Sequence, residues 1–282
     1  EAKEVQILQG PTARLSDMVL SADGNIIIAV TPNWIEDREF HKLWLWDIRN
    51  SEELSVLRDI GKSGQADVRG ADTLAISPDG TLLALNACAG RVDLGLGGLI
   101  CEFAGVQLFN TSSGQLEVDM SHAFVNGVWA IAFSPDGKLI AASGKNGTAK
   151  LFSAPSGKEK FTVLEADHHT IDVAFTPDSK TLAVALGDGT IHLFNTETGD
   201  ESNVLEGHAE AVTSIAFSPD GALLASGSTD STVGIWDVST GQRLATLEGH
   251  EDAVLSVAFS PAGTYLASGG NDKAFRLWGL PR

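Results

Sequence analysis

The stretch SIAFSPDG, residues 214–221, runs from a short apolar segment into a compact turn. Proline and aspartate fit the two central positions of a type I turn, and glycine suits its exit. Similar phrases follow short apolar runs elsewhere in the chain: SADG at Ser21, SPDG at Ser77 and Ser134, TPDS at Thr176, and SPAG at Ser260. A strand followed by a tight turn is therefore repeated along the chain.

The last residues of these phrases are regularly spaced in the second half of the chain. Gly137, Ser179, Gly221 and Gly263 follow one another at intervals of 42 residues. A fixed period of this size indicates a repeat architecture. Each period contains short β-branched or alternating runs, such as VLSVAFS, TYLASGG, AFRLW and RLATLEG, separated by turn residues. We therefore expect an all-β chain with four strands per repeat and no helix.

The composition sets limits on the function. The chain has 282 residues, of which 43% are hydrophobic and 20% charged, so it can bury a full core. Its net charge of −18 disfavours a surface that tracks phosphates, and we expect no nucleic acid partner. Because no apolar run approaches the roughly 18 residues of a membrane helix, we expect no membrane insertion. The compartment stays open, with the cytoplasm as the default.

Further words recur in phase with the turn. LEGH begins at Leu205 and Leu247, LASGSTD begins at Leu224, and IWD ends at Asp237. These words, in this order, resemble the WD-repeat β-propeller family over essentially the whole chain. The resemblance implies a ring of blades, each a four-stranded antiparallel sheet, and a non-catalytic scaffold that binds a protein or peptide.

The resemblance also implies a hydrogen-bonded tetrad in each complete blade. A His before the first strand, a Ser in the second, an Asp in the next tight turn and a Trp in the third make up this tetrad. Two complete sets are present: His208, Ser226, Asp230 and Trp236, then His250, Ser268, Asp272 and Trp278. Ser, His and Asp also form hydrolase triads, but an active site has no reason to recur in successive repeats. We interpret both sets as scaffold and expect no catalytic residue.

Earlier repeats depart from the tetrad pattern. Phe194, Phe152 and Phe109, which lack an indole donor, take the position of the Trp. Val184 and Ala142 take the position of the Ser. We expect these blades to rely on packing rather than on buried polar networks.

Six turn phrases predict a six-bladed β-propeller in a single domain, residues 1–282. The two ends of the chain add up to nearly one period, which makes them complementary parts of one blade. ILQG at Ile7 aligns with TLEG at Thr246, so we expect an amino-terminal strand, residues 4–9, to complete the last blade and close the ring. The expected blades span about 12–58, 59–120, 121–164, 165–206, 207–248 and 249–282.

The first two repeats are longer than the last one. Seven extra residues lie within 31–42, fourteen within 88–105, and seven more within 58–70, before the second blade. We expect loops here, all on one rim of blades one to three, because successive connections alternate between rims. Loops on a rigid scaffold often carry binding residues, which predicts a partner site on this rim. Neutral drift of surface loops is the alternative.

The resemblance places further partner contacts at the first strands and just before the tetrad Asp. With two aromatic residues of the first insertion, the predicted binding set is Trp34, Phe40, Asp72, Trp129, His169, Ile171, Thr213, Thr229, Leu255 and Asn271. The apolar members act as interface anchors or pack the channel mouth. Glu36, Asp37 and Glu39 around the first two suggest a basic peptide partner, or a solvated charge run.

Other chemical sites are less well supported. Cys88 and Cys101 flank the largest insertion, where a disulfide would indicate an oxidising compartment and two reduced thiols would not. DHH, residues 167–169, lacks paired ligand spacing, so we expect no metal. LGLGGL, residues 94–99, does not open a helix, and we expect no cofactor. The alternative function is an enzyme or small-ligand-binding propeller with its site at the channel mouth, and the oligomeric state stays open.

Overall fold

The computed structural model describes residues 17–21, 24, 26–35, 38–47, 52–53, 73–93, 99–125 and 127–280. The regular elements in these ranges are all β-strands, so the all-β prediction is confirmed. Over the same ranges, no helix is long and apolar enough to span a membrane. The chain divides into two compact units, Glu1–Ala123 and Phe124–Arg282.

The amino-terminal unit contains two antiparallel sheets of four strands each. The carboxylate of Asp17 in one sheet accepts the backbone N–H of Leu74 in the other at 2.9 Å, which links their first strands. The first sheet consists of β1 (Asp17–Leu20), β2 (Ile26–Ile35), β3 (Arg38–Asp47) and β4 (Glu52–Glu53). The second consists of β5 (Leu74–Ile76), β6 (Leu82–Asp93), β7 (Leu99–Asn110) and β8 (Leu116–Val125).

The carboxy-terminal unit contains three four-stranded antiparallel sheets and a last sheet with three described strands. The first two sheets are β9 (Val128–Phe133), β10 (Leu139–Gly144), β11 (Thr148–Ser153) and β12 (Glu159–Glu165), then β13 (Thr170–Phe175), β14 (Thr181–Leu186), β15 (Ile191–Asn195) and β16 (Glu201–Leu205). The others are β17 (Val212–Phe217), β18 (Leu223–Ser228), β19 (Val233–Asp237) and β20 (Arg243–Leu247), then β21 (Val254–Phe259), β22 (Tyr265–Gly270) and β23 (Phe275–Gly279).

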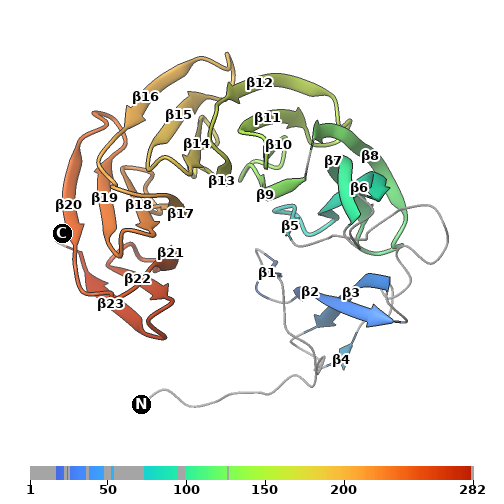
Figure 1. Cartoon of the computed structure of the whole chain (residues 1–282), viewed down its shortest axis with the longest axis horizontal. Coiled ribbons are helices and arrows are strands. Elements are labelled where there is room, and N and C mark those ends of the chain that lie inside the picture. Colours follow the sequence, from blue (N-terminus) through green and yellow to red (C-terminus); the bar gives the residue numbers. More distant parts are fainter. Residues whose placement is uncertain are drawn as a thin grey trace. The chain divides into compact units, whose positions relative to one another are not determined.

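Neighbouring sheets of this unit pack face to face. Their first strands, β9, β13, β17 and β21, contact one another in succession on the inner side, and the fourth strands β12, β16 and β20 lie on the outer side (Figure 1). Between the sheets lie apolar layers; Ile191 and Leu193 of one sheet, for example, pack with Val212, Ile215 and Trp236 of the next. Repeated four-stranded sheets stacked in this way are consistent with a β-propeller.

The turn phrase forms the predicted tight turn. In the β17–β18 turn, Gly221 N–H donates to the carbonyl of Ser218 at 2.8 Å, and the Ser218 hydroxyl donates to Asp220 at 2.6 Å. Gly221 has a φ of 73°, a left-handed conformation that glycine adopts without a steric penalty. Ser179 adopts the same conformation in the one phrase that ends in serine, with a φ of 63°.

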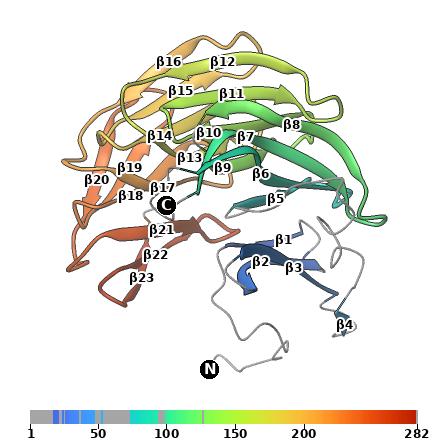
Figure 2. The same cartoon turned by 45° about the vertical axis from the view of Figure 1, so that its right-hand side comes forward.

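The expected loops of the first two repeats differ in the structure. The added residues lengthen paired strands: β2 and β3 have 10 residues each, and β6 and β7 have 12 each. The ladders continue to Ile35 opposite Arg38 and to Asp93 opposite Leu99 (Figure 2). Pairing satisfies the backbone donors and acceptors of segments such as LICEF, which an open loop would leave to water. The insertions within 31–42 and 88–105 therefore belong to long β-hairpins.

Several predictions of architecture fall outside what the structure describes. The proposed closing strand, residues 4–9, lies outside the described residues, as does the whole segment 58–70 that contains the third insertion. Strand β8 runs to Val125, beyond the expected blade boundary at residue 120. The single domain, the blade boundaries and the closed six-bladed ring therefore stay predictions.

Candidate functional site

The β17–β20 sheet brings together the four residues of the first tetrad. His208, just before β17, contacts Asp230 through Nδ1 at 2.8 Å and Ser226 through Nε2 at 2.7 Å. Trp236 in β19 donates its Nε1–H to Ser226 Oγ at 2.7 Å. The four side chains thus form one hydrogen-bonded chain that joins two strands, a turn and the connection into β17.

One assignment of protons satisfies this chain. The Asp230 carboxylate only accepts, so His208 Nδ1 carries the proton and Nε2 is the acceptor. The Ser226 hydroxyl therefore donates to Nε2 while its oxygen accepts from Trp236. Because each of these buried polar groups has a partner, the tetrad avoids the free-energy cost of burying them unpaired.

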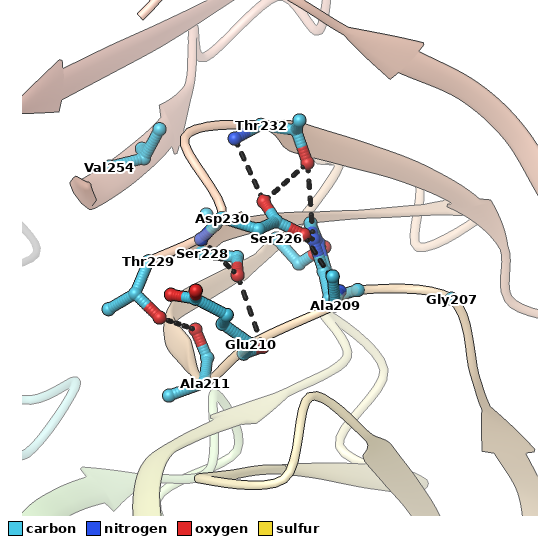
Figure 3. Close-up of polar contacts among 12 residues, drawn as sticks. Gly207, Ala209, Glu210, Ala211, Ser226, Ser228, Thr229, Asp230, Thr232 and Val254 are labelled. Atoms are coloured by element: carbon cyan, nitrogen blue, oxygen red, sulfur yellow. Dashed lines mark hydrogen bonds and ion pairs between the residues drawn. The ribbon is translucent and has the colours of Figure 1, made fainter. Parts of the chain in front are cut away.

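Asp230 is held by further donors in its turn. Its carboxylate accepts the N–H and the hydroxyl of Thr232 at 2.9 and 2.7 Å, and the N–H of Ala209 at 3.0 Å (Figure 3). Burial acts to raise the pKa of Asp230, but these hydrogen bonds and that of His208 outweigh it and lower the pKa to about 2. Burial also lowers the pKa of His208, against the opposing effect of Asp230. The folded tetrad therefore contains a carboxylate and a neutral imidazole.

The β21–β23 sheet repeats this arrangement. His250 contacts Asp272 at 2.9 Å and Ser268 at 2.8 Å, and Trp278 donates to Ser268 at 2.9 Å. Burial opposes ionisation of Asp272, but hydrogen bonds from His250 and from the backbone N–H of Ala274 lower its pKa to about 2. Both predicted sets are thus brought together in the same geometry.

An arginine extends each tetrad, and sequence reasoning missed both. Arg243 in β20 donates to the carbonyl of Gly207 at 2.5 Å. Arg276 in β23 donates to the equivalent carbonyl of Gly249 at 2.5 Å and to Asp272 at 3.0 Å. The two arginines reach equivalent positions from different strands, so the 42-residue period does not relate them. A repeat pattern alone could not have found them.

Both tetrads share the Ser–His–Asp contacts of a hydrolase triad, but neither has an accessible nucleophile. Ser226 is 0% exposed and Ser268 is 2% exposed, and each Oγ already accepts an indole N–H. A substrate carbonyl has no access to an oxygen buried in this way. The tetrads therefore connect strands of the scaffold.

The β9–β12 and β13–β16 sheets, which lack the tetrad, fill the same place with apolar side chains. Phe152 and Phe194 are both 2% exposed at the position of the Trp. Ala142 and Val184 are fully buried at the position of the Ser. These sheets rely on packing here, as expected from the residue types.

The predicted binding residues of the carboxy-terminal unit lie at one edge of its sheets. In each sheet the turn between the second and third strands is tied to the residue preceding the first strand. The backbone N–H of Thr229 donates to Ala211 at 3.0 Å, and that of Asn271 donates to Ala253 at 2.8 Å. We call this edge the turn edge. It consists of the first-strand starts and of the turns at 145–147, 187–190, 229–232 and 271–274.

The side chains on the turn edge differ in exposure. Trp129 and Leu255 are exposed by 44% and 50%, although both belong to inner strands. Ile171 is half-buried. Thr213 is tied to the scaffold, because its hydroxyl donates to the carbonyl of Gly227 at 3.0 Å. The exposed tryptophan ring stacks on His169, with 6.2 Å between ring centroids.

Comparison with known protein families identifies the repeats. The family model described as WD domain, G-beta repeat, matches residues 117–153, 159–195, 199–237 and 241–279, together more than half of the chain. The chain belongs to the WD-repeat family. No curated protein sequence matches it. WD-repeat domains generally act as scaffolds for protein–protein interactions.

Each WD repeat spans parts of two sheets that follow one another in the chain. The match at residues 199–237 begins in the fourth strand of one sheet, β16, and ends with the third strand of the next, β19. The other three matches are staggered in the same way. Each repeat therefore links one blade covalently to the next, and one repeat alone cannot form a complete blade.

Three predicted binding residues of this WD-repeat chain cannot be placed. Asp72 lies outside the described residues. Trp34 and Phe40 belong to β2 and β3 by their backbone, and their side chains are also outside the described part. Their binding roles stay predictions.

Two further predictions concern a possible disulfide and a possible metal site. The register of β6 and β7 sets Cys88 opposite Ala104 and Cys101 opposite Arg91, so the two cysteines are not directly paired. Their side chains lie outside the described part, and the alternatives of a disulfide and two thiols stay open. Within the described ranges, no group of three His, Cys, Asp or Glu side chains is placed to hold a metal ion.

Proposed function

We propose that this WD-repeat chain is a non-catalytic scaffold that binds a protein or peptide along its turn edge. The observation that carries the proposal is the exposure of Trp129 and Leu255 at the same position of two different blades. Large apolar side chains held exposed on a rigid framework are the anchors that dominate protein interfaces.

The backbone around these anchors is fixed before any partner arrives. Beside Trp129, the N–H of Ala130 donates to Ser143 Oγ at 3.1 Å. Beside Leu255, the turn residue Asn271 is hydrogen-bonded to Ala253. A rigid anchor loses less conformational entropy on binding than a flexible one, which favours affinity.

The two long hairpins extend the proposed binding surface in the first two blades. β2–β3 and β6–β7 connect second to third strands, as do the turns of the turn edge. In a ring of equivalent blades both hairpins would project from the same rim as Trp129 and Leu255. Trp34 and Phe40 of the first hairpin belong to this proposed rim. Asp72, at the start of the second blade, belongs to it as well.

We also propose that six blades form a closed ring. The last sheet supports ring closure on the face where a next blade would pack. On this face Phe275 and Leu277 are exposed by 93% and 69%. The equivalent Val233 and Ile235 of the preceding sheet are exposed by 0% and 4%, since the next sheet covers them. A further blade over Phe275 and Leu277 would restore this burial.

The first sheet exposes an apolar residue on the face that would pack against the last sheet. Met18 in β1 is 59% exposed, whereas the equivalent Val173, Ile215 and Val257 are at most 6% exposed under a preceding sheet. Packing the first sheet against the last would bury both surfaces. Residues 4–9 would then supply the fourth strand beside β23.

A matched pair of substitutions tests closure. Leu277→Asp places a charge on the face that closure would bury, and Leu244→Asp places one on the outer strand β20, where the leucine is 56% exposed. In a closed ring, Leu277→Asp lowers the free energy of unfolding by about 3 kcal/mol, and the control changes it by about 0.5 kcal/mol or less. Urea denaturation measures both, and equal small losses would contradict closure.

A capture experiment tests the binding function. Intact chain, Leu255→Arg, and a variant with residues 91–103 shortened to a turn are each used to recover partners from an extract for mass spectrometry. We expect a set of proteins recovered by the intact chain and by the control Leu244→Arg, but lost with one or both rim variants. Recovery that is identical for all four chains would overturn the proposed rim.

A further inference from the structure

An exposed cluster of aromatic and basic side chains lies on the turn edge of the β9–β12 blade. Trp129 stacks on His169 at an interplanar angle of 20°. On the same ring, the ammonium group of Lys145 lies 5.6 Å from the centroid. We call Trp129, Lys145 and His169 the Trp129 cluster.

The scaffold holds this cluster in place. The backbone N–H of Lys145 donates to the carbonyl of Gly127 at 3.0 Å, and His169 Nδ1–H donates to the carbonyl of Lys145. The hydroxyl of Thr170, next to His169, donates to Gly144 at 2.9 Å. The turn that carries Lys145 is therefore tied to the start of the next blade, and the three side chains are preorganised.

The repeat fold does not require these residues. One period later, the positions of Trp129, Lys145 and His169 carry Ile171, Gly187 and Ala211. Two periods later they carry Thr213, Thr229 and Ala253. Because those blades form the same turn edge without a basic aromatic cluster, stability of the fold does not explain the cluster.

The charges of the cluster are available for a ligand. Lys145 and His169 are exposed, and Lys145 takes part in none of the ion pairs between described residues. The bond to the Lys145 carbonyl places a proton on His169 Nδ1, which leaves Nε2 as the second polar atom of the ring. An ammonium and an imidazole beside an apolar indole surface suit a carboxylate attached to an apolar segment.

We propose that the Trp129 cluster binds an acidic segment of the partner. The Lys145 ammonium pairs with an Asp or Glu carboxylate of that segment, and Trp129 packs against an apolar neighbour. This inference rests on the proposed binding function and adds the chemistry of the partner. It differs from the basic peptide expected from residues 34–40, which belong to another blade. The net charge of −18 opposes such a partner at long range, but salt screens that repulsion beyond about 8 Å at physiological ionic strength.

Synthetic peptide arrays test the inference directly. The arrays carry 12-residue peptides of random sequence with equal overall numbers of acidic and basic residues. The chains compared are the intact protein, Lys145→Glu, Trp129→Ala, and the control Lys158→Glu, which alters an exposed lysine in the β11–β12 turn. Equal melting temperatures of the four chains exclude misfolding as the cause of any difference.

We expect the intact chain and Lys158→Glu to select peptides rich in Asp and Glu. Lys145→Glu and Trp129→Ala should each weaken the affinity for the selected peptides at least about tenfold, as expected for loss of a charge-assisted contact or an apolar anchor. Acidic peptides that bind Lys145→Glu equally well would overturn the inference.

Failure of the inference can be separated from failure of the proposed function. Selected peptides without acidic enrichment that are lost with Trp129→Ala but not with Lys145→Glu would retain the binding function and overturn the acidic partner. Absence of any selected peptide, together with unchanged recovery in the capture experiment, would overturn both.

Discussion

Two neighbouring blades build the same interior position in different ways. In the β17–β20 blade, Trp236 and Ser226 belong to a buried polar chain that ends at Asp230. In the β13–β16 blade, Phe194 and Val184 occupy the equivalent places and are buried without polar groups. The strand register is nevertheless the same in both blades.

This difference shows that the blade fold does not require the tetrad, which is one of several ways to stabilise it. Leu182 pairs with Phe194 as Leu224 pairs with Trp236, so the pairing of second and third strands does not depend on the tetrad. Apolar packing is sufficient to form a blade. The tetrad additionally ties the Asp230 turn to the connection before β17, which apolar side chains cannot do with the same directional specificity.

Between these two blades, the largest effect is expected where the polar chain loses its acceptor. Asp230→Ala leaves the buried Nδ1–H of His208 without its carboxylate, and we expect a loss of about 2–3 kcal/mol in unfolding free energy. The matched control is Asp188→Ala in the β13–β16 blade, at the equivalent turn position. Asp188 is exposed and accepts hydrogen bonds from the backbone and the hydroxyl of Thr190, so its removal should cost about 0.5–1 kcal/mol.

Urea denaturation of the two aspartate variants measures this comparison. Equal losses would mean that Asp230 acts only within its own turn, as Asp188 does. The tetrad would then contribute little beyond packing.

A reciprocal exchange of the two aromatic residues should cost stability in both blades. Trp236→Phe removes the donor to Ser226, for an expected loss of about 1–2 kcal/mol. Phe194→Trp adds volume and directs an indole N–H toward Val184, which has no acceptor, for about 1–3 kcal/mol. If Phe194→Trp left the stability unchanged, the apolar interior of the β13–β16 blade would accommodate an indole as well as the tetrad blade does. Thermal unfolding of both variants decides this.

The tetrad blade should also lose stability as the pH falls through the range in which His208 titrates. Burial lowers the folded pKa of His208 below its ordinary value of 6.5, so the unfolded chain binds this proton first. The stabilisation is complete above about pH 6.5 and declines as the pH falls toward the folded pKa. Unfolding measured at about pH 7.5 and 5.5 should show a smaller decline in His208→Gln than in the intact chain. An identical decline would contradict the lowered pKa.

The smallest effect is expected for polar pairs on the outer strands. His192 of the β13–β16 blade contacts Glu201 at 2.5 Å, and the glutamate side chain is 45% exposed. Partly exposed polar pairs of this kind contribute little, so Glu201→Gln should cost at most about 0.5–1 kcal/mol. At the corresponding positions of the next blade, Gly234 replaces the histidine and Arg243 lies over Trp236. Arg243→Lys should therefore cost more than Glu201→Gln in the same denaturation assay.

Much of the fold could be predicted from the turn phrase and its 42-residue period. The phrase predicted where strands end, and alternating runs predicted four strands per repeat, because both depend on local chemistry. The His, Ser, Asp and Trp of the tetrads were identifiable because they recur in phase. Arg243 and Arg276 were not, because they reach equivalent carbonyls from different strands.

The candidate binding surface was less predictable. Position within the repeat indicated Trp129 and His169. Lys145 was not in the predicted set, although it has the repeat position of Thr229 and Asn271, and its place over the Trp129 ring depends on the turn between β10 and β11. The inserted segments were expected to be loops, and most of the added residues instead continue the ladders of β2–β3 and β6–β7. Periodicity describes residues that repeat, whereas an insertion has no second copy with which to compare it.

The sequence by itself determined the all-β repeat, its turns and the residues of both tetrads, since each follows from local propensity or from a recurring spacing. Only the tertiary structure decided which side chains meet across those spacings. The stacking of Trp129 on His169 and the two routes by which arginine reaches a tetrad depend on contacts between elements far apart in the chain. Such contacts are set by packing in three dimensions, which no local pattern of residues specifies.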